Sequence, residues 1–123
     1  MKSIILVGGR GSRMGETTVS TPKSLVKVKN EPIIEKQINV LKKCLITDIN
    51  LVTGYLSYSF NYLNLSCIHN DEWESSNMVY GLMKADNLLS KYTTIISYGD
   101  IFYKEDVLHK MINCNYNICL AYD

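Results

Sequence analysis

Short apolar runs alternate along this chain with longer segments whose apolar residues recur at helical spacing. Five runs are rich in β-forming residues and predict strands, at Ile4–Val7, Ile49–Thr53, Leu65–His69, Thr93–Tyr98 and Asn117–Tyr122. Strands that alternate with helices build βαβ units around a parallel sheet. We therefore expect an α/β fold whose mostly parallel sheet is covered on both faces.

Three segments between these runs predict helices. The first has an apolar stripe, with Pro32 suited to its first turn, formed by Ile34, Ile38, Leu41 and Leu45. The second follows the capping residues Ser75, Ser76 and Asn77, and its stripe is Met78, Leu82, Ala85 and Leu89. A shorter stripe follows Asp106 and comprises Val107, Leu108, Met111 and Ile112.

Composition limits the function classes that remain open. With 123 residues, 46% of them hydrophobic and 20% charged, the chain is expected to form one domain, residues 1–123, with a real core. The net charge is +1 and the basic residues are dispersed, so we expect no nucleic-acid-binding face. The apolar runs are shorter than the roughly 18 residues that a membrane span needs. We expect a cytoplasmic protein without a membrane partner.

The four cysteines contain no C-x-x-C pair. They lie at positions 44, 67, 114 and 119, each in an apolar stretch where a free thiol behaves as a small hydrophobe. We expect reduced thiols in the core, in preference to zinc ligands or disulfides.

The loop after the first run combines glycines with positive charge. It reads GGRGSRMGETTVSTPKSL from residue 8 to residue 25. The dinucleotide fingerprint G-x-G-x-x-G fails because Met14 stands where the third glycine belongs, and a Walker A loop fails because Pro22 precedes Lys23. A glycine turn still lets backbone N–H groups approach a nucleotide, while Arg13 and Lys23 supply charge to a triphosphate. Neither of these two common phosphate-binding motifs fits the loop, so it has to belong to another kind of nucleotide-binding motif.

In parallel sheets, ligands bind beyond the carboxyl ends of the strands. The segments there are residues 8–23, 54–55, 70–77, 99–100 and 123. Two of them together, Gly-x-Gly-Ser-Arg-Met and Pro-Lys-Ser-Leu, resemble the signature of the sugar-phosphate and cholinephosphate nucleotidyltransferases, which have a MobA-like NTP transferase fold. That signature reads G-x-G-[ST]-R-[LM], a spacer, and P-K-x-L.

The resemblance extends along the chain. Residues 29–41 match a helix that begins K-x-x-P-I-I, and residues 51–55 match a strand ending in Gly-Tyr. The segment NDEWESSNM, residues 70–78, is similar to an element of the cytidylyltransferase branch, which includes cholinephosphate cytidylyltransferases and capsule enzymes. The run that ends in Asp100 is similar to the strand carrying the family's metal-binding aspartate. The resemblance implies a Rossmann-like three-layer sandwich of the nucleotide-diphospho-sugar transferase type.

It also implies a reaction. A nucleotidyltransferase moves a nucleoside monophosphate, here CMP from CTP, to a small phosphorylated or phosphonylated acceptor and releases pyrophosphate. By resemblance Lys23 and Arg13 are catalytic, acting on the α-phosphate and the triphosphate, while Asp100 holds Mg²⁺. The residues implied in nucleotide binding are Gly8, Gly9, Gly11, Ser12, Gly54 and Asn77. A homodimer is compatible with the resemblance.

Other interpretations stay open at this point. Arg13 and Lys23 could be solvated loop charges, Asp100 a turn cap and Asn77 a helix cap. Near the strand ends, core packing is favoured over a choline-binding cage for the aromatic residues Tyr55, Trp73, Tyr80, Tyr98 and Tyr103.

The resemblance implies a longer protein, because complete enzymes of the family run to roughly twice this length. Domains of about 200 residues or more are ordinary for such sheets. The chain also stops on a strand-like run without a covering element, which natural chains rarely leave at a sheet edge. We therefore expect a truncated N-terminal half. A non-catalytic nucleotide-binding domain or a sugar-1-phosphate nucleotidyltransferase using another NTP is the alternative.

Overall fold

A four-stranded parallel sheet forms the centre of the molecule. The computed structural model describes residues 1–122. The strands lie in the order β5-β4-β1-β6, with bounds Ser66–His69, Ile49–Thr53, Lys2–Leu6 and Thr94–Tyr98. All neighbouring pairs are parallel, and Ile5 of β1 lies in register with Leu51 on one side and Ser97 on the other. Four of the five predicted strands are confirmed.

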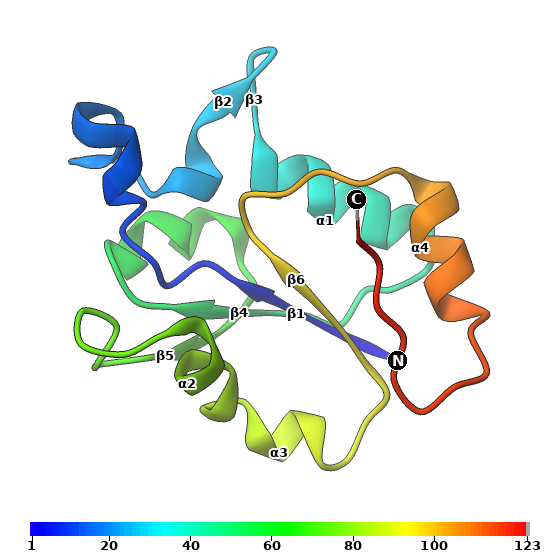
Figure 1. Cartoon of the computed structure of the whole chain (residues 1–123). Helices are drawn as coiled ribbons and strands as arrows, with labels where there is room; N and C mark the ends of the chain where they lie inside the picture. The colour runs from blue at the N-terminus through cyan, green and yellow to red at the C-terminus, as the bar shows by residue number, and fades with distance from the viewer. Residues whose placement is uncertain (123) are drawn as a thin grey trace.

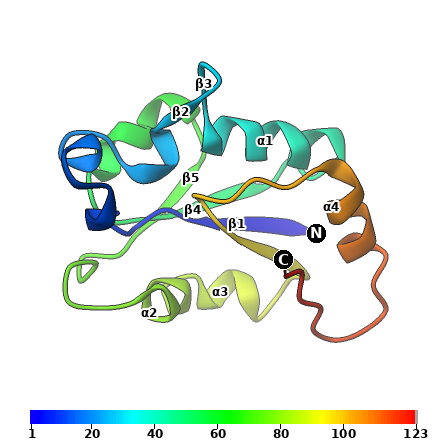
Figure 2. The ribbon, with the colours of Figure 1, turned by 45° about the horizontal axis from the view of Figure 1, so that its top comes forward.

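Helices cover both faces of this sheet (Figures 1 and 2). One face carries α1 and α4, whose bounds are Ile33–Lys43 and Glu105–Ile112. The opposite face carries α2 and α3, which span Met78–Met83 and Asp86–Leu89. The expected three-layer α/β sandwich with a parallel sheet is therefore confirmed.

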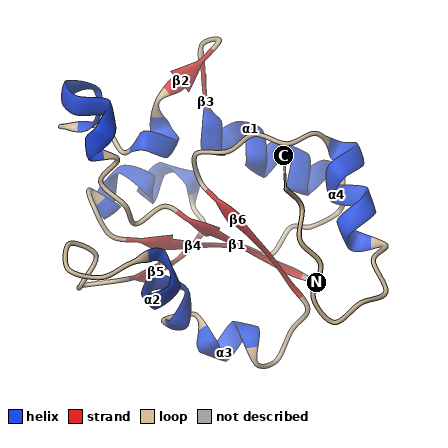
Figure 3. Cartoon of the chain, in the orientation of Figure 1, coloured by secondary structure: helices blue, strands red, loops and turns tan. Residues whose placement is uncertain are grey.

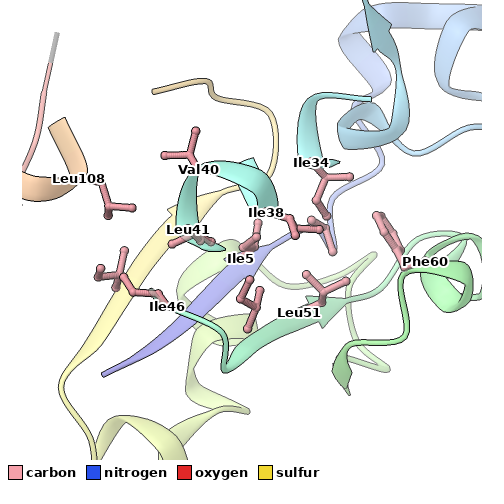
Figure 4. Close-up of a cluster of buried hydrophobic side chains, with 12 residues drawn as sticks. Ile5, Ile34, Ile38, Val40, Leu41, Ile46, Leu51, Phe60 and Leu108 are labelled. Carbon is pink, nitrogen blue, oxygen red and sulfur yellow. The ribbon is translucent and has the colours of Figure 1, made fainter. Parts of the chain in front are cut away.

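Two separate apolar clusters lie on either side of the sheet. Figure 4 shows the larger one, in which Ile5 and Leu51 of the sheet meet Ile38 and Leu41 of α1 and Phe60. The smaller cluster packs Ile4, Leu6, Val52 and Ala85 beneath α2 and α3. Because successive residues of a strand point to opposite faces, Ile4 and Ile5 serve different clusters.

The end of α1 differs from the predicted stripe. Leu45 is 87% exposed, and the buried residue beyond the helix is Ile46. Leu45 adopts a left-handed φ of +63°, while the Ile46 N–H donates to the Leu41 carbonyl at 2.9 Å. This is a Schellman ending, in which the chain reverses and brings Ile46 back onto Leu41. At the other end Pro32 precedes the helix instead of joining its first turn.

The second predicted helix is two short helices. Asn77 caps α2 by accepting a hydrogen bond from the Tyr80 N–H at 3.0 Å, as predicted. The helical path breaks at Ala85, which is buried against the sheet and starts α3. The apolar stripe continues across the break, so spacing alone did not reveal it.

Three short helices and a hairpin were not predicted (Figure 3). The 3-10 helices η1, η2 and η3 span Ser12–Thr18, Lys23–Leu25 and Ser57–Leu63. The hairpin joins β2, Lys27–Val28, to β3, Glu31–Pro32. Its two turn residues, Lys29 and Asn30, both have positive φ, as a tight primed turn requires.

The predicted strand at residues 117–122 is wrong. The segment has no strand structure, and Ile118 and Leu120 are more than four-fifths exposed. A strand needs a partner for its backbone groups, and none of the strands in residues 1–122 pairs with this segment.

The expectation of reduced core thiols is confirmed for Cys44, which packs as a free thiol against the larger cluster, and is wrong for the exposed Cys67 and for Cys114 and Cys119. Cys114 and Cys119 are joined in a disulfide, which the five-residue separation allows because the intervening turn brings their Cα atoms to 6.7 Å. Cys44 is half-buried and Cys67 is exposed on the edge strand β5.

In the described chain, no helix combines the length and apolar character that a bilayer span requires.

Candidate nucleotide-binding site

The loops that follow the sheet strands meet at its carboxyl edge. The Tyr55 N–H donates to the Gly8 carbonyl at 3.0 Å, which ties the loop after β4 to the loop after β1. The Gly99 N–H donates to the Leu6 carbonyl at 2.9 Å, which ties the turn after β6 to the end of β1. The loops that follow β1, β4 and β6, in which most of the predicted site residues lie, therefore surround one edge of the sheet.

Gly54 is required by a close approach of backbone and ring. A Cβ atom at this position would lie 2.5 Å from the Cβ of Trp73 and 2.7 Å from the Gly8 carbonyl oxygen. No carbon side chain fits at such distances. Glycine at position 54 thus lets the β1 loop, the β4 loop and Trp73 converge.

The glycine-rich loop folds back on itself. Gly11 has a φ of +67°, which glycine adopts without steric cost, and its carbonyl accepts a hydrogen bond from the Thr18 hydroxyl at 2.9 Å. A Cβ on Gly11 would lie 3.0 Å from the Lys23 Cβ. The Tyr55 hydroxyl donates to the Thr18 carbonyl at 3.0 Å. The loop is thereby fixed beside the lysine.

Lys23 faces Asp100 across the edge of the sheet. Lys23 begins η2 behind the buried Pro22, whose fixed φ stiffens the approach. The Lys23 ammonium group forms an ion pair with the Asp100 carboxylate, although the residues are 77 positions apart in sequence. The Lys23 side chain is 42% exposed and the Asp100 side chain is 34% exposed, so water and ligands reach both.

A cavity of about 160 Å³ lies beside Gly8 and Gly9 of the glycine loop, and neither Lys23 nor Asp100 lines it. Its walls include the predicted residues Gly8, Gly9 and Asn77. The remaining wall residues are Leu6, Val52, Asn70, Trp73, Ser76, Met78 and Gly81. The walls are formed by the ends of β1 and β4 and by the segment that leads into α2.

The segment 70–77 is held by its own polar side chains. Asn70 is buried; its side-chain amide donates to the Ser76 hydroxyl at 3.1 Å and its carbonyl oxygen accepts the Glu72 N–H at 3.1 Å. The Asn70 N–H donates to the Thr53 carbonyl at 2.8 Å. Asn70 therefore links this wall of the cavity to β4.

None of the aromatic residues near the strand ends is fully buried. Tyr98 is 52% exposed, and the other four are half-buried. Tyr55 and Trp73 pack in a tilted pair with ring centroids 5.2 Å apart, and the Arg10 guanidinium lies 5.6 Å from the Tyr55 ring. The core-packing interpretation holds for Tyr103, which packs against the larger cluster, and is wrong for the exposed Tyr98.

Six of the predicted site residues do not line the cavity: Gly11, Ser12, Arg13, Lys23, Gly54 and Asp100. Ser12 and Arg13 are exposed on η1 and do not line its walls. Sequence reasoning also missed Gln37, a fully buried amide of α1 that contacts the turn bearing Asp100. The available signal was a polar residue at position 37 on the same face as the apolar Ile34, Ile38 and Leu41.

The chemistry of this edge suits magnesium held through few protein ligands. Within residues 1–122, no group of three or more histidine, cysteine or acidic side chains gathers around a common point. Mg²⁺ commonly binds through one or two carboxylates together with water and substrate phosphates. Asp100, which is partly exposed and pairs with the Lys23 ammonium group, fits that role.

Sequence comparisons find cytidylyltransferases among the relatives of this chain. The chain is 36% identical to the CTP:phosphoglutamine cytidylyltransferase of Campylobacter jejuni, an alignment that covers all of this chain and 53% of that protein. It is 42% identical to the choline-phosphate cytidylyltransferase of Streptococcus pneumoniae over 67% of this chain and 38% of that one. The chain thus spans about half the length of the curated relatives it matches.

A solved cytidylyltransferase structure is similar to this chain in fold as well. The CTP:phosphocholine cytidylyltransferase of Streptococcus pneumoniae superposes with a TM-score of 0.76 at 32% identity, over 85% of this chain and 49% of that one. The family model described as the MobA-like NTP transferase domain matches residues 3–122. The chain therefore belongs to the MobA-like NTP transferase family.

Proposed function

We propose that this chain is the nucleotide-binding part of a cytidylyltransferase, which transfers CMP from CTP to a small phosphorylated or phosphonylated acceptor. The observation that carries the proposal is the meeting of Lys23 and Asp100 beside the glycine-rich loop. A cation and a carboxylate at that place supply the two charges that a magnesium-bound triphosphate needs.

The cavity walls suggest where the nucleotide lies. The exposed backbone at Gly9 leaves open space, since nothing lies within 4 Å of a Cβ built there. The polar wall residues Asn70, Ser76 and Asn77 offer amide and hydroxyl groups to a base or ribose. The triphosphate then extends from the cavity toward Lys23, with Arg13 on η1 at its outer end.

The reaction is an in-line displacement at the α-phosphorus. An acceptor phosphate or phosphonate oxygen forms a bond to that phosphorus as the bond to the bridging oxygen of pyrophosphate breaks. Lys23 neutralises charge on the α-phosphate oxygens while it develops, and the loop holds the triphosphate in line. Magnesium, held by Asp100, supplies further charge neutralisation when bound.

The relatives support a choice of nucleotide and of acceptor class. Cytidylyltransferases acting on phosphoglutamine and choline phosphate support CTP as the nucleotide and a small phosphate as the acceptor. Because the chain spans about half of these proteins, the acceptor itself stays unassigned. The chain's own residues account for the nucleotide side of the reaction.

Thermal unfolding in the presence of nucleotides tests the proposal. A ligand at about 100 times its Kd adds about 2.7 kcal/mol of stability. We expect CTP with Mg²⁺ to raise the melting temperature more than UTP, GTP or ATP does. An equal response to all four nucleotides would remove the base assignment, and no response to any would remove the proposed function.

A second candidate is a nucleotide-binding domain that does not catalyse transfer. Pyrophosphate release from CTP and Mg²⁺ with a panel of small phosphates distinguishes the two. CTP binding without release by a chain extended to the relatives' length would favour this second candidate.

A further inference from the structure

Gln37 is a buried amide whose hydrogen bonds are all directed at one turn. It lies on α1 with no exposed surface, among the apolar residues that face the sheet. Its Nε2 group donates to the Tyr98 carbonyl at 2.8 Å and to the Ile101 carbonyl, and its Oε1 accepts from the Ser97 hydroxyl at 3.2 Å. Both donor hydrogens of the amide thus have a partner.

These partners bracket Asp100. The Tyr98 carbonyl precedes Asp100 by two residues and the Ile101 carbonyl follows it by one. The other side of the turn is fixed by Gly99, whose N–H donates to the Leu6 carbonyl at 2.9 Å and whose added Cβ would lie 2.5 Å from Val7 Cγ1. Asp100 therefore leaves the sheet from a turn held between β1 and α1.

Removal of the amide would release this turn. The Tyr98 and Ile101 carbonyls, which are now bonded within the protein, would both lose their donor. The carbonyls regain hydrogen bonds to water when their peptide planes rotate. The Tyr98–Gly99 and Ile101–Phe102 peptide planes lie one peptide outside the two planes that join residue 100 to its neighbours. They hold that short segment at both ends, so their rotation changes the direction in which the Asp100 side chain points.

We propose that Gln37 is the positioning residue for Asp100, aiming its carboxylate at Lys23 and, with nucleotide bound, at the magnesium ion. The inference rests on the proposed function of the site. Gln37 touches neither nucleotide nor metal in this account; it acts through the turn. Outer partners of this kind change metal affinity or activity by about 10–100-fold when they are removed.

Calorimetric titration with CTP tests this role. The factor by which Mg²⁺ strengthens CTP binding is measured for the wild type, Gln37→Leu, Asp100→Asn and the double variant. We expect Gln37→Leu to reduce that factor about tenfold, with little change in CTP affinity without metal. We expect it to have no further effect in the Asp100→Asn background, because the group it aims is then absent.

The matched control is Asn39→Leu, which removes another amide of α1. Asn39 is exposed and donates to Glu31 at 3.2 Å, away from the turn. We expect it to leave the Mg²⁺ factor unchanged. Ser97→Ala removes the bond to Oε1 and keeps both bonds from the Gln37 Nε2 group. It serves as a milder variant should Gln37→Leu not fold, and we expect from it a smaller loss of the same factor.

A loss of equal size in the wild-type and Asp100→Asn backgrounds would overturn the positioning role and leave a purely structural one. An unchanged Mg²⁺ factor in Gln37→Leu or Ser97→Ala would do the same. Absence of CTP binding by the wild type would instead refute the proposed function. In that event a crystal structure of either variant still decides, since an Asp100 carboxylate unmoved from Lys23 would contradict the inference.

Discussion

Replacement of Gly54 by alanine tests the convergence of loops on which the site depends. The added methyl group would lie 2.5 Å from the Trp73 Cβ and 2.7 Å from the Gly8 carbonyl oxygen. Neither atom is the end of a flexible side chain. The Gly8 carbonyl is fixed by the Tyr55 N–H at 3.0 Å, so the backbone must shift to admit the methyl group.

The size of the effect follows from these distances. Carbon atoms pack at about 3.5–4.0 Å, so the contact with Trp73 must open by about 1 Å or more. Overpacking of this kind costs about 1–3 kcal/mol. For a chain of this size we expect the melting temperature to fall by about 4–12 °C. We also expect weaker CTP binding, because Trp73 lines the cavity.

Thermal unfolding of Gly54→Ala and Gly9→Ala measures the difference. Gly9→Ala is the matched control for stability, since nothing lies within 4 Å of its added Cβ and its φ is not in the left-handed region. We expect its free energy of unfolding to change by less than about 0.5 kcal/mol. Equal stabilities of the two variants would refute the close approach at Gly54.

Two further predictions concern the fold. Leu41 is fully buried, so Leu41→Ala should lower the free energy of unfolding in urea by about 2–5 kcal/mol. Leu45 is 87% exposed, so Leu45→Ala should lower it by less than about 0.5 kcal/mol. Similar losses in the two variants would contradict the Schellman ending of α1. Hydrogen bonds from Lys2 and Asn50 lower the pKa of Asp48 below 3.8 in the folded protein. The stability from Asp48 is therefore complete above its unfolded pKa and is lost as pH falls through the lower folded pKa. Acid unfolding should show this loss in the wild type and not in Asp48→Asn, and identical acid profiles would contradict it.

Local sequence predicted the layers because each strand and helix keeps one periodicity from end to end. It failed where the chain changes direction. The end of α1 gave no signal, since Leu45 is neither glycine nor asparagine, yet it adopts the left-handed conformation. Residues 117–122 carry the composition of a strand, but strand formation depends on a partner that local composition does not specify.

The site was predictable to the extent that it follows from topology. Lys23 and Asp100 lie far apart in sequence, and the rule that ligands bind beyond parallel strand ends was enough to expect them together. Gln37 could not be assigned in this way, because its partners are backbone carbonyls of a distant turn. The placement of Arg13 on η1, outside the cavity, was equally beyond a motif match.

Titration of the wild type and of Lys23→Met with CTP and with cytidine, in the presence of Mg²⁺, isolates the triphosphate contact. A charge-assisted hydrogen bond contributes about 1.5–3 kcal/mol. We expect Lys23→Met to bind CTP about 10–100-fold more weakly and to bind cytidine, which has no phosphate, as the wild type does. Unchanged CTP affinity, or an equal loss for both ligands, would contradict a triphosphate held between Lys23 and Asp100.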